Sequence, residues 1–142
     1  MHQTTFATPE TVTRAWHITS AKGEVLGDVA VRVAKFLMGK HKADWTTHTD
    51  GGDYVVVTDV ESLVWTRNKG EKKIYKFHSG YMGGLTEINL ATLHAKKPEQ
   101  VLELAVKRML PKSQQGRDQL KRLKVYKGNA HPHVAQAPKP IA

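Results

Sequence analysis

The sequence predicts an α/β domain with a mostly parallel sheet. The alternating run Trp16–Thr19 is followed by an amphipathic stretch from Val25 to Met38, and then by the continuous apolar run Tyr54–Thr58. A strand, a helix and a second strand in this order are typical of a βαβ unit. A continuous apolar strand is typical of a parallel sheet that is covered on both faces. With 142 residues and no linker-like stretch, the chain is expected to be a single domain, residues 1–142.

The first half of the chain supplies the first strands and helix of this domain. Residues 1–15 are expected to form a loosely ordered leader. The helix has its apolar residues at positions 26, 29, 30, 33, 34 and 37, which lie on one face, and Gly39 is expected to end it. After the strand Tyr54–Thr58, Ser62–Thr66 is a candidate short strand and Arg67–Lys73 is expected to be a basic loop.

The second half predicts two further strands and three helices. Ile74–His78 alternates as a strand does, and Leu85–Leu90 is a candidate extended segment. Helices are expected around Ala91–Lys96, from Pro98 to the residues before Pro111, and over Arg117–Arg122; the strand Leu123–Tyr126 follows the third. Residues 129–142 contain three prolines and are expected to form an extended arm.

Composition excludes several classes of protein. The chain has no cysteine, which removes disulfides, thiol nucleophiles and zinc–thiolate sites. No apolar run approaches the roughly 18 residues of a membrane span. The N-terminal residues lack the apolar region of a secretory signal, so we expect a cytoplasmic protein.

Positive charge is concentrated in one half of the chain. Residues 1–71 hold eight Lys/Arg and nine Asp/Glu, whereas residues 72–142 hold fourteen and four. This asymmetry indicates that one half meets a polyanion, and nucleic acid is favoured over a basic surface kept for solubility.

The stretch Lys107–His133 carries most of this signal. Between Lys107 and Lys127 it has eight Lys/Arg against a single acid, Asp118, with apolar residues threaded between the charges. A flexible tail has no use for such hydrophobes, so the stretch is expected to be folded. Cations held at this density match the spacing of a phosphate backbone.

Four other patterns have a functional and a structural interpretation. Gly80–Gly84 could cradle a phosphate, but no Gly-Lys-Ser/Thr follows, and a tight turn is favoured. His131-Pro132-His133 has weak metal-ligand spacing. His48, Asp50 and Asp53 could serve acid–base chemistry, but Asp and Gly before a strand are more often turn formers. Lys40-His41-Lys42 suits both a helix end and a polyanion contact.

We therefore expect no catalytic residue, no metal site and no cofactor. The tryptophans at positions 16, 45 and 65 are interpreted as core or loop anchors in preference to base-stacking platforms.

Several runs together resemble one family, the bacterial-type large-subunit ribosomal protein thirteen. They occur in the family's order and spacing from about Trp16 to the C-terminal arm: Gly39–Ala43, His48–Tyr54, His78–Leu85, Val106–Lys112, Gly116-Arg117, Leu123–Gly128 and His131–Gln136. Each run alone is modest, but the ordered set is very specific. Two positions depart from the family pattern: Asp28 stands where Arg is usual, and Arg67 stands where glycine is usual.

The resemblance implies a three-layer α/β/α domain, binding to large-subunit ribosomal RNA early in assembly, and no catalysis. The implied partners are that RNA and neighbouring ribosomal proteins, with messenger RNA as a further candidate and neither a membrane nor a small-molecule substrate. The implied location is the cytoplasmic ribosome, with an organellar ribosome as an open alternative. Two other functions stay open: an enzyme or binder of phosphorylated small molecules on the same scaffold, and a regulator that binds messenger RNA off the ribosome.

The residues expected to contact RNA are mostly cations, joined by histidines, a tyrosine and the glycines of the 80–84 turn. Arg117 and Arg122 are the expected bidentate phosphate contacts, because a planar guanidinium fits that geometry. The full set is Lys40, His41, Lys42, Lys69, Lys72, His78, Gly80, Gly83, Gly84, Lys107, Arg108, Lys112, Arg117, Lys121, Arg122, Lys124, Tyr126, Lys127, His131 and His133.

Overall fold

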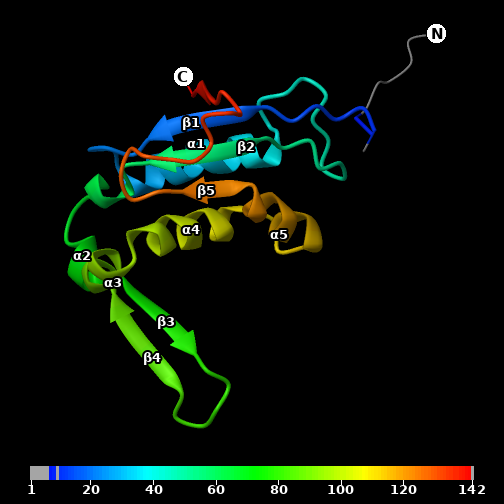
Figure 1. The fold of residues 1–142 in the computed structure, drawn as a ribbon. Coiled ribbons are helices and arrows are strands. Elements are labelled where there is room, and N and C mark those ends of the chain that lie inside the picture. The colour runs from blue at the N-terminus through cyan, green and yellow to red at the C-terminus, as the bar shows by residue number, and fades with distance from the viewer. Residues whose placement is uncertain (1–6, 9, 142) are drawn as a thin grey trace.

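A parallel sheet lies at the centre of the computed structural model, which describes residues 7, 8 and 10–141. Its four strands have the order β5–β2–β1–β6 and are β1 (Trp16–Ser20), β2 (Tyr54–Thr58), β5 (Leu123–Val125) and β6 (Lys139–Pro140) (Figure 1). All three pairings are parallel, with Trp16 opposite Tyr54 and Val55 opposite Leu123. The predicted α/β class and parallel sheet are confirmed.

Helix α1 (Leu26–Met38) follows β1, as its apolar stripe predicts. The six stripe residues are all buried. Gly39 ends the helix in the left-handed conformation at φ +79°, which glycine adopts without a steric penalty. The Gly39 N–H donates to the Phe36 carbonyl and the Lys40 N–H to the Lys35 carbonyl, so the last turn is closed.

The remaining helices gather on the same side of the sheet as α1. Helix α4 (Pro98–Met109) packs along α1 and contacts α5 (Gln114–Lys121) and α3 (Leu90–Lys96). Val55 and Val57 of β2, together with Val33 of α1 and Leu102 of α4, are fully buried in this core. Among the described residues, no helix is long and apolar enough to cross a membrane.

The opposite face of the sheet carries an aromatic group. Side chains alternate along a strand, so Tyr54 faces away from Val55 and the core helices. Trp16 stacks on Tyr54 with ring centroids 4.4 Å apart, and the His133 ring lies 4.9 Å from Trp16. The C-terminal segment therefore covers this face in the described part of the chain, where the three-layer expectation had helices (Figure 1).

A hairpin projects from the body (Figure 1). It consists of β3 (Ile74–His78) and β4 (Leu85–Asn89), which pair antiparallel. Gly80 and Gly83 in its turn have φ angles of +91° and +72°, so the glycine-rich run is a tight turn, as favoured from the sequence.

The segment between β2 and β3 differs from the prediction. Ser62–Thr66 is not a strand: the 3₁₀ helix η1 (Val60–Ser62) precedes a single bridge between Val64 and Val25. Asp59, at φ +56°, turns the chain immediately after β2 and prevents a continued strand. The expected basic loop Arg67–Lys73 contains one helical turn, α2 (Lys69–Lys72).

Both ends of the described chain contact the domain. In the C-terminal arm, β6 pairs with His17 and Ile18 of β1. In the expected leader, Ala7 is buried and the Thr13 carbonyl accepts a 2.8 Å hydrogen bond from the Lys42 ammonium. Residues 1–6 and 9 of the leader, and residue 142, lie outside the described residues.

Candidate nucleic-acid interface

The basic stretch after Val106 is folded, as its threaded hydrophobes predict. Val106 and Leu110 are buried in the core, which fixes the end of α4. Lys107, Arg108 and Lys112 lie on the exposed side, and none of the three forms an ion pair with a carboxylate among the described residues. Their charges are therefore available to a partner and held on rigid backbone.

A hollow of about 340 Å³ lies between the end of α4 and the start of α5. Among the described residues, its lining contains three cations and no acid: Lys107, Pro111, Lys112, Ser113, Gly116, Arg117 and Leu120. Gly116 allows the start of α5 to lie close to Pro111, because a Cβ at position 116 would lie 1.8 Å from the Pro111 carbonyl oxygen. Positive charge converging on a concave surface without a carboxylate favours an anion.

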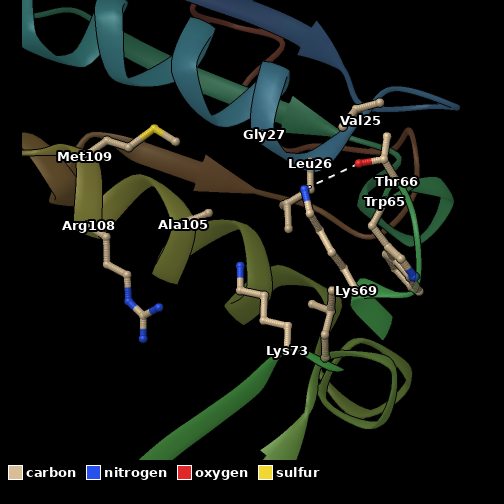
Figure 2. Close-up of a pocket in the computed structure, with 11 residues that line it drawn as sticks. Val25, Leu26, Gly27, Trp65, Thr66, Lys69, Lys73, Ala105, Arg108 and Met109 are labelled. Carbon is tan, nitrogen blue, oxygen red and sulfur yellow. Dashed lines mark hydrogen bonds between the residues drawn. The ribbon is translucent and has the colours of Figure 1, made fainter. Parts of the chain in front are cut away.

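A second hollow, of about 230 Å³, lies between α1, α2 and α4 (Figure 2). Three cations and an apolar floor line it: Val25, Leu26, Gly27, Trp65, Thr66, Lys69, Lys73, Leu90, Ala105, Arg108 and Met109. The Lys69 ammonium donates to the Thr66 hydroxyl at 3.4 Å, and no acid lines this hollow in the part of the chain that the structure describes. Lys107 and Arg108 are consecutive residues of α4, so the two hollows lie on neighbouring faces of the same helix.

Sequence reasoning missed two residues of the second hollow, Lys73 and Trp65. Lys73 follows α2 and is four positions after Lys69, the spacing that puts two side chains on one side of a helical turn. Had a helical turn been predicted in place of the basic loop, the spacing of Lys69 and Lys73 would have indicated that both face the same side.

Arg117 and Lys121 of α5 are exposed, and their nearest partners are on the same helix. The Arg117 guanidinium donates to Gln114 Oε1 at 2.8 and 3.1 Å, and Lys121 Nζ lies 2.8 Å from Asp118 Oδ1. Hydrogen bonds from Lys121 and then Gln114 lower the pKa of Asp118. Exposed pairs of this kind are weak, so both cations stay available to phosphate.

Arg122 is not on the surface, contrary to the expectation for a phosphate contact. Its side chain is 8% exposed, and both terminal nitrogens donate to the Asp50 carboxylate, at 2.7 and 2.5 Å. One of them also lies 3.3 Å from the Leu37 carbonyl oxygen. Arg122 directly precedes β5, where Asp50 lies beside it. The Asp50 carboxylate therefore accepts the bidentate pair of hydrogen bonds that was expected to go to a phosphate.

Lys42 and His41 are likewise engaged inside the protein, around the buried carboxylate of Asp53. Lys42 Nζ lies 2.6 Å from Oδ1, which also accepts the Ala15 N–H at 3.0 Å. The Nε2 atoms of His41 and His17 lie 2.9 and 3.1 Å from Oδ2. Lys42 Nζ further donates to the carbonyl oxygens of residues 13 and 51, both at 2.8 Å.

The pKa of Asp53 is lowered despite its burial. Burial alone would raise this pKa, but hydrogen bonds from Lys42, the Ala15 N–H and His17, with the charge of Lys42, favour the ionised form. The ring nitrogens of His17 and His41 and the Asp53 carboxylate lie within 4.8 Å of one another, a geometry that could hold a metal ion. His17 of β1 was not predicted as a member of this cluster, because it is far in sequence from His41 and Asp53 and joins them only through the pairing of β1 with β2.

The other expected contact residues lie outside the two hollows. Lys72 ends α2, and Lys40 lies over the Trp45 ring at 5.3 Å. His78, Gly80, Gly83 and Gly84 are at the hairpin turn, where the Gly80 N–H donates to His78 Nδ1 at 3.0 Å. Lys124, Tyr126, Lys127, His131 and His133 lie on or after β5, and the Tyr126 hydroxyl is 2.9 Å from His133 Nε2.

Comparisons with known proteins agree with the resemblance seen in the sequence. The family described as Ribosomal protein L13 matches residues 14–132. The chain is 50% identical to "Large ribosomal subunit protein uL13" of Thermotoga petrophila over 141 residues, which cover 99% of this chain and 95% of that protein. It is 51% identical to the protein of the same name from Coxiella burnetii over 138 residues, 97% of each chain. The chain therefore belongs to the ribosomal protein L13 family, a family of ribosomal proteins and not of enzymes.

Proposed function

We propose that this chain is a structural component of the large ribosomal subunit in the cytoplasm and binds the subunit's RNA early in assembly. Neighbouring ribosomal proteins would be its other partners. The observation that carries the proposal is the basic surface of α2, α4 and α5: two hollows lined by cations and by no acid. The names of the relatives, large-subunit proteins, support the same assignment.

The mechanism would be electrostatic and geometric. Each cation that neutralises a phosphate releases a condensed counterion, which favours binding most strongly at low salt. Cations on packed helices keep their spacing, so the surface suits RNA that is already folded and is recognised by shape. Arg117, whose guanidinium has one amide oxygen as its partner among the described residues, is best suited to a bidentate phosphate contact.

The test is binding of the full chain to a fragment of large-subunit ribosomal RNA, across a range of salt concentrations. Unrelated duplex RNA and a messenger RNA leader serve as competitors. We expect tighter binding to the ribosomal fragment than to either competitor. Equal affinity for all three would contradict a specific site, and preference for the messenger RNA would favour the regulatory alternative.

A triple variant tests the location of the interface. Lys107→Gln, Lys112→Gln and Arg117→Gln together should lower the slope of log K against log salt by about 2, because each phosphate contact contributes about 0.7 to 0.9. Stability should change by less than about 0.5 kcal/mol, because these residues are exposed. The matched control changes three exposed lysines elsewhere, Lys22, Lys96 and Lys97, to Gln. An equal loss of slope in both variants would contradict the proposed interface.

A further inference from the structure

The hollow between α1, α2 and α4 has two chemically different parts (Figure 2). Its floor is apolar: Leu26 and Leu90 are buried there, and Ala105 and Met109 of α4 extend the same surface. Trp65 contributes an aromatic wall. A simple phosphate site needs none of this apolar area.

Its rim is cationic. Lys73 Nζ lies 5.2 Å from the centre of the Tyr75 ring and the Arg108 guanidinium 5.6 Å from the same ring, so one buried aromatic side chain holds two of the cations. Lys69 is held by the Thr66 hydroxyl, as the dashed line in Figure 2 shows. None of the three pairs with a carboxylate in the described part of the chain. An apolar ligand alone would have no use for this charge.

A nucleotide has the matching composition: a flat ring system beside an anionic phosphate. The volume, about 230 Å³, is below the roughly 300–1,000 Å³ of pockets for drug-sized ligands, so the hollow accommodates one nucleotide at most. We propose that this hollow takes a single unpaired nucleotide of a folded RNA, with its base on the apolar floor and its phosphate at Lys69, Lys73 and Arg108. The inference rests on the RNA-binding function proposed above and adds a specific subsite to it.

A free mononucleotide has the same chemistry, but the surroundings favour RNA. Arg108 is adjacent to Lys107, which lines the hollow between α4 and α5. A second group of cations thus begins one residue away from the subsite on α4, which suits a chain of phosphates and is not needed for a single nucleotide. Loops and bulges of a folded RNA present unstacked bases to proteins, and aromatic side chains accept such bases with little sequence preference.

Gly27 offers a way to fill the hollow without removing a charge. A Cβ at Gly27 would meet no atom within 4 Å, and the residue lies in the first turn of α1. Gly27→Leu should therefore fold at least as well as the natural chain, because leucine is the better helix former. The matched control is Val31→Leu, one turn later on the same helix, where the side chain is exposed and does not line the hollow. Ala105→Met, from the opposite wall, is the second filling variant.

The measurement is affinity for the ribosomal RNA fragment across salt, with thermal unfolding to verify the fold. Both filling variants should bind about tenfold more weakly, the size expected for one stacked base. The salt slope should stay close to that of the natural chain, because the base loses its place on the floor while the three rim cations can still contact the phosphate. Val31→Leu should bind normally. This signature differs from that of the Lys107, Lys112 and Arg117 triple variant, which lowers the slope.

The remaining outcomes separate this inference from the proposed function. Normal RNA binding by both folded filling variants, with weakened binding by the triple variant, would overturn the nucleotide subsite and leave RNA binding intact. Normal binding by all variants would contradict the proposed interface as well. If adenosine or uridine monophosphate raises the unfolding temperature of the natural chain but not of Gly27→Leu, while both filling variants bind the RNA fragment normally, the hollow is a site for free nucleotides, and the RNA subsite is overturned.

Discussion

The protein contains two groups of charged side chains that look alike in sequence and differ in structure. In the first group, Arg122 and Lys42 are paired with Asp50 and Asp53. In the second, the cations of α2, α4 and the α4–α5 connection have no carboxylate partner among the described residues. Cation density in the sequence therefore does not reveal which charges are free to bind a partner. Whether a cation is free depends on where the nearest carboxylate lies in the folded structure.

The topology of the sheet explains the first group. In parallel strands the amino ends meet at one edge of the sheet, and β2 lies between β1 and β5. Ala15 precedes β1, Asp53 precedes β2 and Arg122 precedes β5, so all three lie at that edge. The Arg122–Asp50 pair thus ties the loop before β2 to β5, and the contacts of Asp53 with the Ala15 N–H and His17 tie it to β1. The Lys42–Asp53 pair holds the loop together, and we infer that the role of both pairs is structural.

The largest expected effect tests this role. Arg122→Met leaves the Asp50 carboxylate without its partner, and removal of one member of a largely buried pair costs about 3 kcal/mol. Urea unfolding should show this loss, while the folded variant keeps the RNA affinity of the natural chain. Lys121→Met, which breaks the exposed pair with Asp118, is the matched control and should cost less than about 0.5 kcal/mol. Equal losses in the two variants would contradict the assigned difference.

A smaller effect is expected from acid. Because folding lowers the pKa of Asp53, its stabilising contribution is present above the ordinary value of 3.8 and is lost as pH falls through the lower folded value. The urea midpoint should therefore fall steeply below about pH 4. Asp53→Asn should be less stable at neutral pH and lose this part of the acid dependence. Asp118→Asn is the control: the pKa of this carboxyl is also lowered, but the group lies at the surface, so its removal should flatten the acid slope much less than Asp53→Asn does.

The smallest effect concerns Arg67, near the basic surface. Its φ angle is +57°, in the left-handed region, which costs a non-glycine residue about 1–2 kcal/mol. Arg67→Gly removes that strain but adds about 0.4–1 kcal/mol of unfolded-state entropy, so a net gain of about 0.5–1 kcal/mol is expected. Gly23→Ala, at φ +71° with open space around it, should lose stability as the reverse control. A loss of stability in Arg67→Gly would mean that the Arg67 side chain makes contacts that outweigh its backbone strain.

Local patterns predicted most of the fold. The apolar stripe of α1, the apolar run of β2 and the alternation of β3 each predict the observed element. Each pattern reflects whether one face or both faces of the element are buried. The segment after β2 could not be predicted in this way: Asp59 and Arg67 adopt positive φ angles, which are uncommon for residues other than glycine and which no local pattern marks at these positions. The resemblance to the family marked Arg67 as unusual, and the structure has the backbone that glycine would favour there.

The candidate interface could be predicted as a region but not residue by residue. Lys107, Arg108, Lys112 and Arg117 line the hollows. Arg122, from the same run of cations, is buried instead, because only the tertiary structure brings Asp50 to it across 72 residues of sequence. Lys73 and Trp65 were missed for the same reason, since each lines a concave surface only together with residues of α1 and α4.

The strand pairings also govern how this surface comes into existence. Val55 pairs with Leu123 and His17 with Lys139, so no two neighbouring strands of the main sheet are joined by a short turn. Sheets closed by such distant segments form slowly, and their loop-closure entropy is lost before most contacts are gained. The helices that carry the exposed cations lie between β2 and β5 in the chain and pack on the closed sheet. A nascent or partly denatured chain would thus present its cations as a flexible polycation, and shape-selective recognition would begin only when the whole domain has folded.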